Sequence, residues 1–124
     1  MSADADRLRE AFASHQLDRL IGLMDADVTW RGIQPPGEPV PHCHDRDEVR
    51  GVMEHAMAEG TDGRPIIVAE AGDSVVVDPR VEPPPPVDLH QVITFRAGRI
   101  VLIQDYPDRA SAMAAIRPPV ASPA

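Results

Sequence analysis

Residues 87–106 read VDLHQVITFRAGRIVLIQDY and decide the fold, because they predict two long strands joined at one tight turn. Residues 87–96 and 99–106 are rich in β-branched and aromatic side chains, which favour extended backbone. Gly98 lies between them and readily adopts the positive φ that a hairpin turn requires. This stretch therefore predicts the central hairpin of an antiparallel sheet.

The length of the turn at Ala97 and Gly98 decides which side chains share a face of the hairpin. A two-residue type I′ turn requires a positive φ at Ala97, which its Cβ disfavours, whereas a three-residue loop requires one only at Gly98. We therefore expect the three-residue loop, which places Phe95 opposite Arg99. The two-residue loop stays open as the alternative.

Asp105 is the candidate catalytic residue that follows from this register. It lies opposite Leu89 and diagonal to Gln91, while His90 faces away; in the alternative register His90 lies directly across from Asp105. The expected neighbours of Asp105 on the same face are Ile93, Val101 and Ile103. Burial among aliphatic side chains raises the pKa of a carboxyl group toward the range used in acid and base catalysis at neutral pH. A structural role, in which Asp105 accepts hydrogen bonds of the following turn, stays open.

Helical and strand patterns surround this hairpin and predict the fold class. Helices are expected near residues 4–15, 17–24, 45–59 and from 108 onward, and further strands at 28–32, 66–71 and 74–78. Helices that precede an antiparallel sheet predict an α+β fold. We expect a curved antiparallel sheet wrapped around the N-terminal helices, an arrangement that tends to leave a central pocket.

Length and composition limit the protein to one domain and exclude several partners. The chain has 124 residues, enough for a single core, so we assign 1–117 to one domain and 118–124, PPVASPA, to a disordered proline-rich tail. A net charge of −8 and an aromatic content of 3% argue against nucleic acid and membrane surfaces as partners. The single cysteine and the lack of a long apolar stretch favour a cytoplasmic protein.

Trp30 and the segment from His42 to His44 are the remaining places where the sequence suggests chemistry. An indole can line a cavity while its N–H meets a polar group or a ligand. His42, Cys43 and His44 are zinc-ligand types, but adjacent residues of an extended segment diverge, so at most His42 and His44 share a side. We expect no metal here but a loop over the pocket mouth, with metal binding through His42 and His44 as the alternative. The candidate ligand-binding residues are Trp30, His90, Gln91 and Ile103.

Three stretches resemble the nuclear transport factor two-like superfamily and, within it, the SnoaL-like group. They are LDRLIGLMDADVTW at 17–30, CHDRDEVRGVM at 43–53 and QVITFRAGRIVLIQDYPDRASA at 91–112. The resemblance spans residues 4–116 and implies a cystatin-like α+β cone that dimerises through the outer face of its sheet. The superfamily contains ketosteroid isomerases, polyketide cyclases, epoxide hydrolases and non-enzymatic ligand binders, so the resemblance leaves function open.

The resemblance favours cyclase-like chemistry when it is followed residue by residue. The general base, tyrosine donor and acidic partner of the isomerases fall near Gly32, Leu8 and Gln91, none of which can take those roles. The catalytic carboxylate of SnoaL-like cyclases matches Asp105. The implied function is cofactor-free proton transfer, as in isomerisation or aldol-type cyclisation, on an apolar carbonyl compound bound by a homodimer. A non-catalytic ligand-binding or dimeric interaction module is the alternative.

Overall fold

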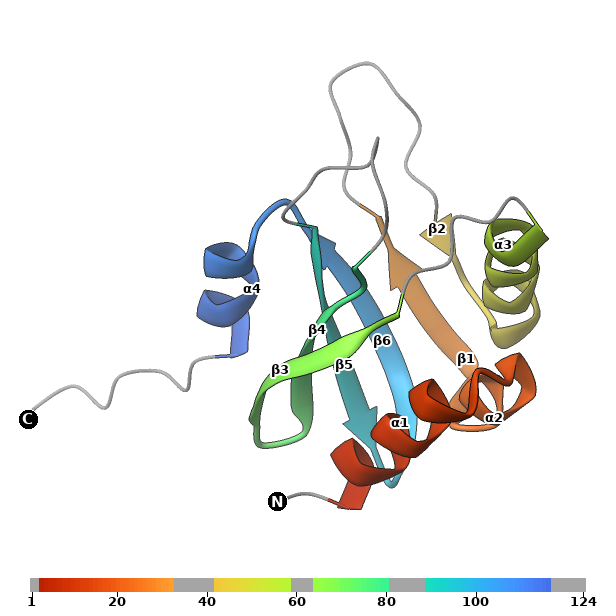
Figure 1. The fold of residues 1–124 in the computed structure, drawn as a ribbon, viewed down its shortest axis with the longest axis horizontal. Coiled ribbons are helices and arrows are strands. Elements are labelled where there is room, and N and C mark those ends of the chain that lie inside the picture. Colours follow the sequence, from red (N-terminus) through yellow and green to blue (C-terminus); the bar gives the residue numbers. More distant parts are fainter. Residues whose placement is uncertain (1–2, 33–41, 59–63, 81–88, 117–124) are drawn as a thin grey trace, which may run out of the picture.

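A curved sheet forms the body of the protein, with helices on both of its sides (Figure 1). The computed structural model describes residues 3–32, 42–58, 64–80 and 89–116, and the expected tail at 118–124 lies outside them. The described elements are α1 (Ala3–Ser14), α2 (Leu17–Ile21), β1 (Met24–Arg31), β2 (His42–Cys43), α3 (Arg46–Ala58), β3 (Ile66–Ala71), β4 (Ser74–Asp78), β5 (His90–Arg96), β6 (Arg99–Tyr106) and α4 (Arg109–Ile116). The predicted α+β class is confirmed.

The described strands form one sheet in the order β2-β1-β6-β5-β4-β3. All neighbouring pairs are antiparallel except β1 and β6, which run parallel. Parallel neighbours need a long connection, and here it contains α3 and the strands from β2 to β5. The sheet is therefore mixed, and the expectation that every pair would be antiparallel is corrected at this one position.

The β5–β6 hairpin combines a two-residue turn with a β-bulge. Arg96 lies opposite Arg99, and the two turn residues Ala97 and Gly98 have φ values of +52° and +79°. A positive φ at both positions is typical of a type I′ turn, whose twist matches the twist of the flanking strands. The expected three-residue loop is wrong, because this match, together with a 2.9 Å hydrogen bond from Arg7 to the Gly98 carbonyl, offsets the cost of a positive φ at Ala97.

The bulge places Gln91 directly opposite Asp105. The register shifts next to Phe95 and leaves Val101 without a partner in β5, so the pairs beyond it are displaced by one residue. His90 therefore pairs with Tyr106, and both expected partners of Asp105, Leu89 in one register and His90 in the other, are corrected. The shift cancels the effect of the shorter turn, so Asp105 and Gln91 share a face as expected.

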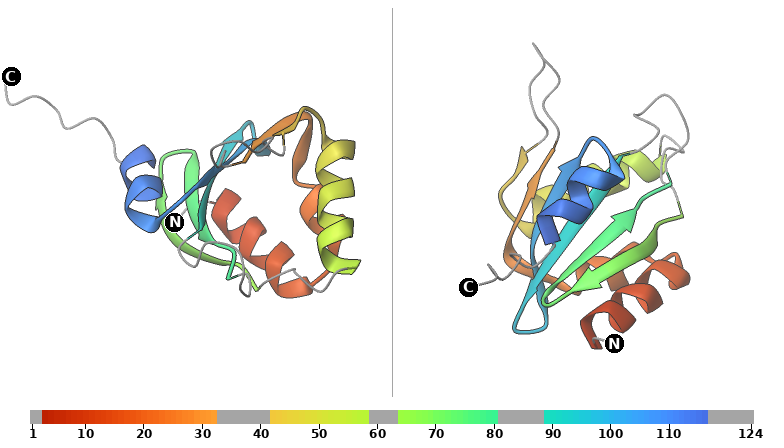
Figure 2. Two further views of the ribbon diagram at one scale, coloured as in Figure 1. Left: turned by 90° about the horizontal axis from the view of Figure 1, so that it is seen from above. Right: turned by 90° about the vertical axis from the view of Figure 1, so that its left-hand side faces the viewer.

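The concave side of the sheet faces α1, α2 and α3 (Figure 2). Leu8 of α1 is fully buried there, as are Met24 and Val28 of β1. Met24 was expected to end a helix, but α2 stops at Ile21 because Gly22 closes it and the chain turns into β1. The main core also contains Ala5, Ile21, Cys43, Val49, Val75, Val77, Ile93, Phe95, Ile100 and Ile103.

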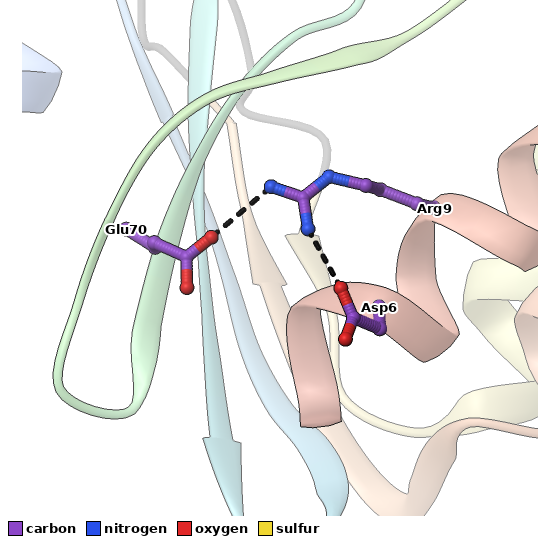
Figure 3. A network of polar contacts seen from close by, with 3 residues as sticks. All are labelled: Asp6, Arg9 and Glu70. Carbon is purple, nitrogen blue, oxygen red and sulfur yellow. Dashed lines mark hydrogen bonds and ion pairs between the residues drawn. The ribbon is translucent and has the colours of Figure 1, made fainter. Parts of the chain in front are cut away.

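Arg9 joins α1 to the edge strand β3 (Figure 3). Its guanidinium contacts Asp6 of the same helix at 2.9 Å and Glu70 of β3 at 3.1 Å. Exposed ion pairs of this kind contribute roughly 0–1 kcal/mol each. Their consequence here is positional, because they fix the helix against the end of the sheet.

The helices α3 and α4 each begin after an aspartate that caps the N-terminus. The Glu48 N–H donates to Asp45 Oδ1 at 2.8 Å at the start of α3, and the Ser111 N–H donates to Asp108 Oδ1 at 2.7 Å at the start of α4. The predicted helices at 45–59 and from 108 onward are therefore confirmed within the described residues, each starting one residue after its cap. Among the described helices, none has the length and hydropathy of a membrane-spanning segment.

α4 packs on the convex side of the sheet, away from the other helices (Figure 2). Ala112 is fully buried there against Val76 and Val92, with Met113 and Ile116 packed around them. The resemblance implies a homodimer that would use this outer face. A dimer formed in that way has to accommodate α4.

Candidate functional site

A cavity of about 290 Å³ lies between the concave face of the sheet and the helices. Its walls are mainly aliphatic and thioether side chains, among them Leu20, Met24, Met53, Ile93, Ile100 and Ile103. Small-molecule sites typically measure roughly 300–1,000 Å³ and are lined mostly by apolar groups with a few placed polar ones. The central cavity is therefore of the size and chemistry that suit a small apolar ligand.

Three polar side chains meet in this cavity from three adjacent strands. Asp105 is on β6, and its Oδ1 accepts hydrogen bonds from Trp30 Nε1 at 3.0 Å and from Gln91 Nε2 at 2.9 Å. The strand register brings these side chains together. Gln91 of β5 pairs with Asp105 of β6, and Trp30 of β1 pairs with Ile103, two residues before Asp105. The sheet thus holds a carboxyl group between two N–H donors.

The second oxygen of Asp105 is not used by these two donors. Both donors use Oδ1, and Oδ2 accepts no hydrogen bond from any residue that the structure describes. Within that part of the chain, no fully buried side-chain oxygen or nitrogen lacks a partner. Oδ2 therefore remains accessible, and a ligand in the cavity can reach it.

Burial raises the pKa of the Asp105 carboxyl group. Loss of solvation disfavours its charged form, while the hydrogen bonds from Gln91 and Trp30 favour that form and lower the pKa. The burial is the larger effect, so the carboxyl binds a proton more readily than an exposed aspartate does. A carboxyl shifted in this direction is better suited to exchange protons near neutral pH.

The structure brings together four of the five predicted site residues. Trp30, Gln91, Ile103 and Asp105 all line the central cavity. His90 does not line the cavity and is only 6% exposed. Successive side chains of β5 point to opposite faces, so His90 lies on the face of Val92 and not on that of Gln91. The expectation that His90 contacts the ligand is therefore corrected, because β5 turns it toward the convex side. Val101, expected beside Asp105, is replaced in the lining by Ile100 because of the bulge.

The segment from His42 to His44 forms a short edge strand and the start of the next turn, not the expected loop. Cys43 pairs with Trp30 and is 3% exposed. Burial, followed by the nearby carboxylates of Glu48 and Asp45, raises the pKa of its thiol, which makes it a poor nucleophile. Among the side chains that the structure describes, no group of three metal-ligand types is close enough to hold an ion; the His42 side chain is outside them.

Sequence reasoning did not find the residues at the mouth of the cavity. His15 and Gln16 line it from the connection between α1 and α2, where His15 has a φ of +54°. His15 falls at the end of the expected helix at 4–15, but α1 ends at Ser14 and leaves His15 exposed. Met53 and Met57 of α3, on the helix expected at 45–59, also line the cavity.

Several solved structures share this architecture. The fold of curved sheet, helices and central cavity is that of nuclear transport factor two-like proteins, which include ketosteroid isomerase-like and cystatin-like folds. A ketosteroid isomerase-like protein from Catenulispora acidiphila, solved with trimethylamine, is 16% identical, with a TM-score of 0.57 over 94% of this chain and 93% of that chain. A protein of unknown function from Burkholderia pseudomallei is 22% identical, with a TM-score of 0.58 over 95% and 100%.

A candidate polyketide cyclase from Sinorhizobium meliloti is 18% identical, with a TM-score of 0.55 over 86% of this chain and 95% of that chain. At these identities the likeness establishes the fold alone. The model of the SnoaL-like domain matches residues 5–103, and the chain belongs to this family. A search of curated protein sequences finds no significant match.

Proposed function

We propose that the protein binds an apolar carbonyl compound in the central cavity and that Asp105 transfers a proton next to the carbonyl group. The observation that carries this proposal is the position of Asp105: one oxygen is held by Trp30 and Gln91, the other has no donor among the described residues, and the residue lines an aliphatic cavity. Membership of the SnoaL-like family supports a small-molecule site in this cavity. Ile103, beside Asp105, would pack against the ligand.

The reaction needs only a proton acceptor and an acidic C–H bond. Asp105 Oδ2 takes the proton from the carbon next to the carbonyl, and the electron pair of that C–H bond forms an enolate. Return of the proton to a different carbon completes an isomerisation. In an aldol-type cyclisation the enolate carbon instead attacks a second carbonyl, which forms a new C–C bond and an alkoxide, and the alkoxide then takes the proton back from Asp105. Both outcomes return the carboxylate to its starting form, and neither requires a cofactor.

A non-catalytic ligand-binding protein is the second function that the site supports. Both donors around Asp105 are already used to hold its Oδ1. The other polar side chains that line the described cavity, His15 and Gln16, are exposed at its mouth. A cavity with few groups able to stabilise an enolate oxygen favours binding over catalysis.

Exchange of carbon-bound protons distinguishes these two functions. We expect the protein to accelerate deuterium incorporation next to the carbonyl of 2-tetralone, a bicyclic apolar ketone, in deuterated buffer monitored by NMR. The fluorescence of Trp30, the single tryptophan, reports occupancy of the cavity in the same sample. Saturable quenching without accelerated exchange would favour the non-catalytic function, and the lack of both would contradict a site for apolar ketones.

A further inference from the structure

A second cavity of about 480 Å³ lies between α1 and β3 and has a different chemistry. Three arginines, Arg9, Arg64 and Arg80, lie around it, and its apolar part includes Phe12 and Ile67. No acidic side chain is among its described lining residues. In a protein with a net charge of −8, this arginine-lined cavity is a local reversal of sign that attracts anions.

The arginines of this cavity differ in what already neutralises them. Arg9 contacts the carboxylates of Asp6 and Glu70, so it holds the wall of the cavity and contributes little free charge (Figure 3). Arg64 and Arg80 are exposed, and their side chains have no hydrogen bond or ion pair with any described residue. These two guanidinium groups are therefore available to an anionic ligand.

The arginine-lined cavity adjoins the central cavity. Phe12, His15 and Pro65 line both of them, so a ligand that fills one can extend past these residues into the other. The shared wall includes the C-terminal end of α1, where the helix dipole carries partial negative charge. That end disfavours anions, and it disfavours a doubly charged phosphate more strongly than a carboxylate with a single charge.

We propose that the arginine-lined cavity binds the carboxylate of an amphipathic ligand whose apolar body fills the central cavity, with Arg64 and Arg80 as the anion-binding residues. This inference rests on the proposed function and narrows its ligand class to carbonyl compounds that also carry a carboxylate. Guanidinium groups suit this task because they donate two parallel hydrogen bonds to a carboxylate. The aliphatic walls of the central cavity suit the apolar remainder of such a molecule.

Matched neutral and anionic probes test the proposal. Decanoate and methyl decanoate share an apolar chain and differ in charge, and both are titrated against the fluorescence of Trp30. We expect decanoate to bind about tenfold more tightly than its ester, and the Arg64→Gln/Arg80→Gln double variant to lose about that factor for decanoate alone. The affinity for decanoate should also fall as sodium chloride is added, because salt screens exposed charges.

Arg96→Gln is the matched control, because Arg96 is also an exposed arginine, lies at the β5–β6 turn and lines neither cavity. It should leave both affinities unchanged, and all variants should keep the melting temperature of the wild type. Equal binding of the two probes, with no effect of the double variant, would overturn the arginine site and leave the central cavity as a site for apolar ligands. Failure of both probes to change the fluorescence would contradict the proposed function and this inference together.

Discussion

Asp105→Asn is expected to lower the rate of deuterium exchange into 2-tetralone by about 10²–10⁴-fold, the usual contribution of a positioned acid or base. Asparagine has nearly the same shape, and its amide oxygen can accept the hydrogen bonds from Trp30 and Gln91. Its amide nitrogen takes the place of Oδ2 and cannot accept the proton. The substitution thus removes the chemistry and retains the architecture, and NMR of the ketone measures the loss.

Asp108→Asn provides the matched control for this experiment. Asp108 lies close to Asp105 in sequence, but it caps α4 and does not line the cavity. Asparagine is also a good cap, so this variant should retain both its fold and the exchange rate of the wild type. Equal exchange rates in wild type and Asp105→Asn, with quenching of Trp30 retained, would remove Asp105 from the reaction.

Leu8→Ala is expected to lower the free energy of unfolding by about 2–5 kcal/mol, the range for a buried leucine replaced by alanine. Leu8 is 0% exposed and belongs to the core that fixes α1 on the concave side of the sheet. The free energy of unfolding of a typical domain is roughly 5–15 kcal/mol, so the loss is a large part of the total stability. Urea denaturation followed by circular dichroism measures it.

Leu102→Ala is the corresponding control on the sheet, because Leu102 of β6 is only partly buried. The same number of carbon atoms is removed, but less apolar surface returns to water, so the loss should be clearly smaller than at Leu8. Losses of equal size would contradict the placement of α1 in the core. The central cavity would then lack one of its walls.

The fold class and several elements followed from local patterns alone. The strands Ile66–Ala71, Ser74–Asp78 and Arg99–Tyr106 agree with the predicted bounds, because turn residues such as Gly72 and Gly98 interrupt β-rich runs there. Hydrophobic periodicity also predicted the helices on the concave side. These features depend on residues that are close in sequence, where propensity and spacing are informative.

The register of the hairpin could not be predicted because it depends on packing across the sheet. The bulge beside Phe95 sets the pairs beyond it, and it exchanged Val101 for Ile100 in the cavity. Asp105 and Gln91 were still placed on one face, since the shorter turn and the inserted residue cancel. Trp30 as a donor to Asp105 was not predicted, because their contact requires the parallel pairing of β1 with β6.

The arginine-lined cavity is a second feature that local patterns do not indicate. Arg64 precedes β3 and Arg80 follows β4, so the β3–β4 hairpin separates them in sequence. Neither arginine belongs to a recognisable motif. Antiparallel pairing of Ile66 with Asp78 brings these strand ends together. Such sites arise from topology, so only the folded arrangement shows them.

The pH titration of the Trp30 indole N–H signal tests most directly whether a desolvated carboxyl group faces the cavity. A single tryptophan gives a single indole signal, and its N–H donates to Asp105, so protonation of that carboxyl changes its chemical shift. We expect a transition whose midpoint lies above the ordinary aspartate pKa of about 3.9, that rises further with bound 2-tetralone, and that is missing in Asp105→Asn. A midpoint at the ordinary value, unchanged by the ketone, would place the carboxyl in water and contradict the account.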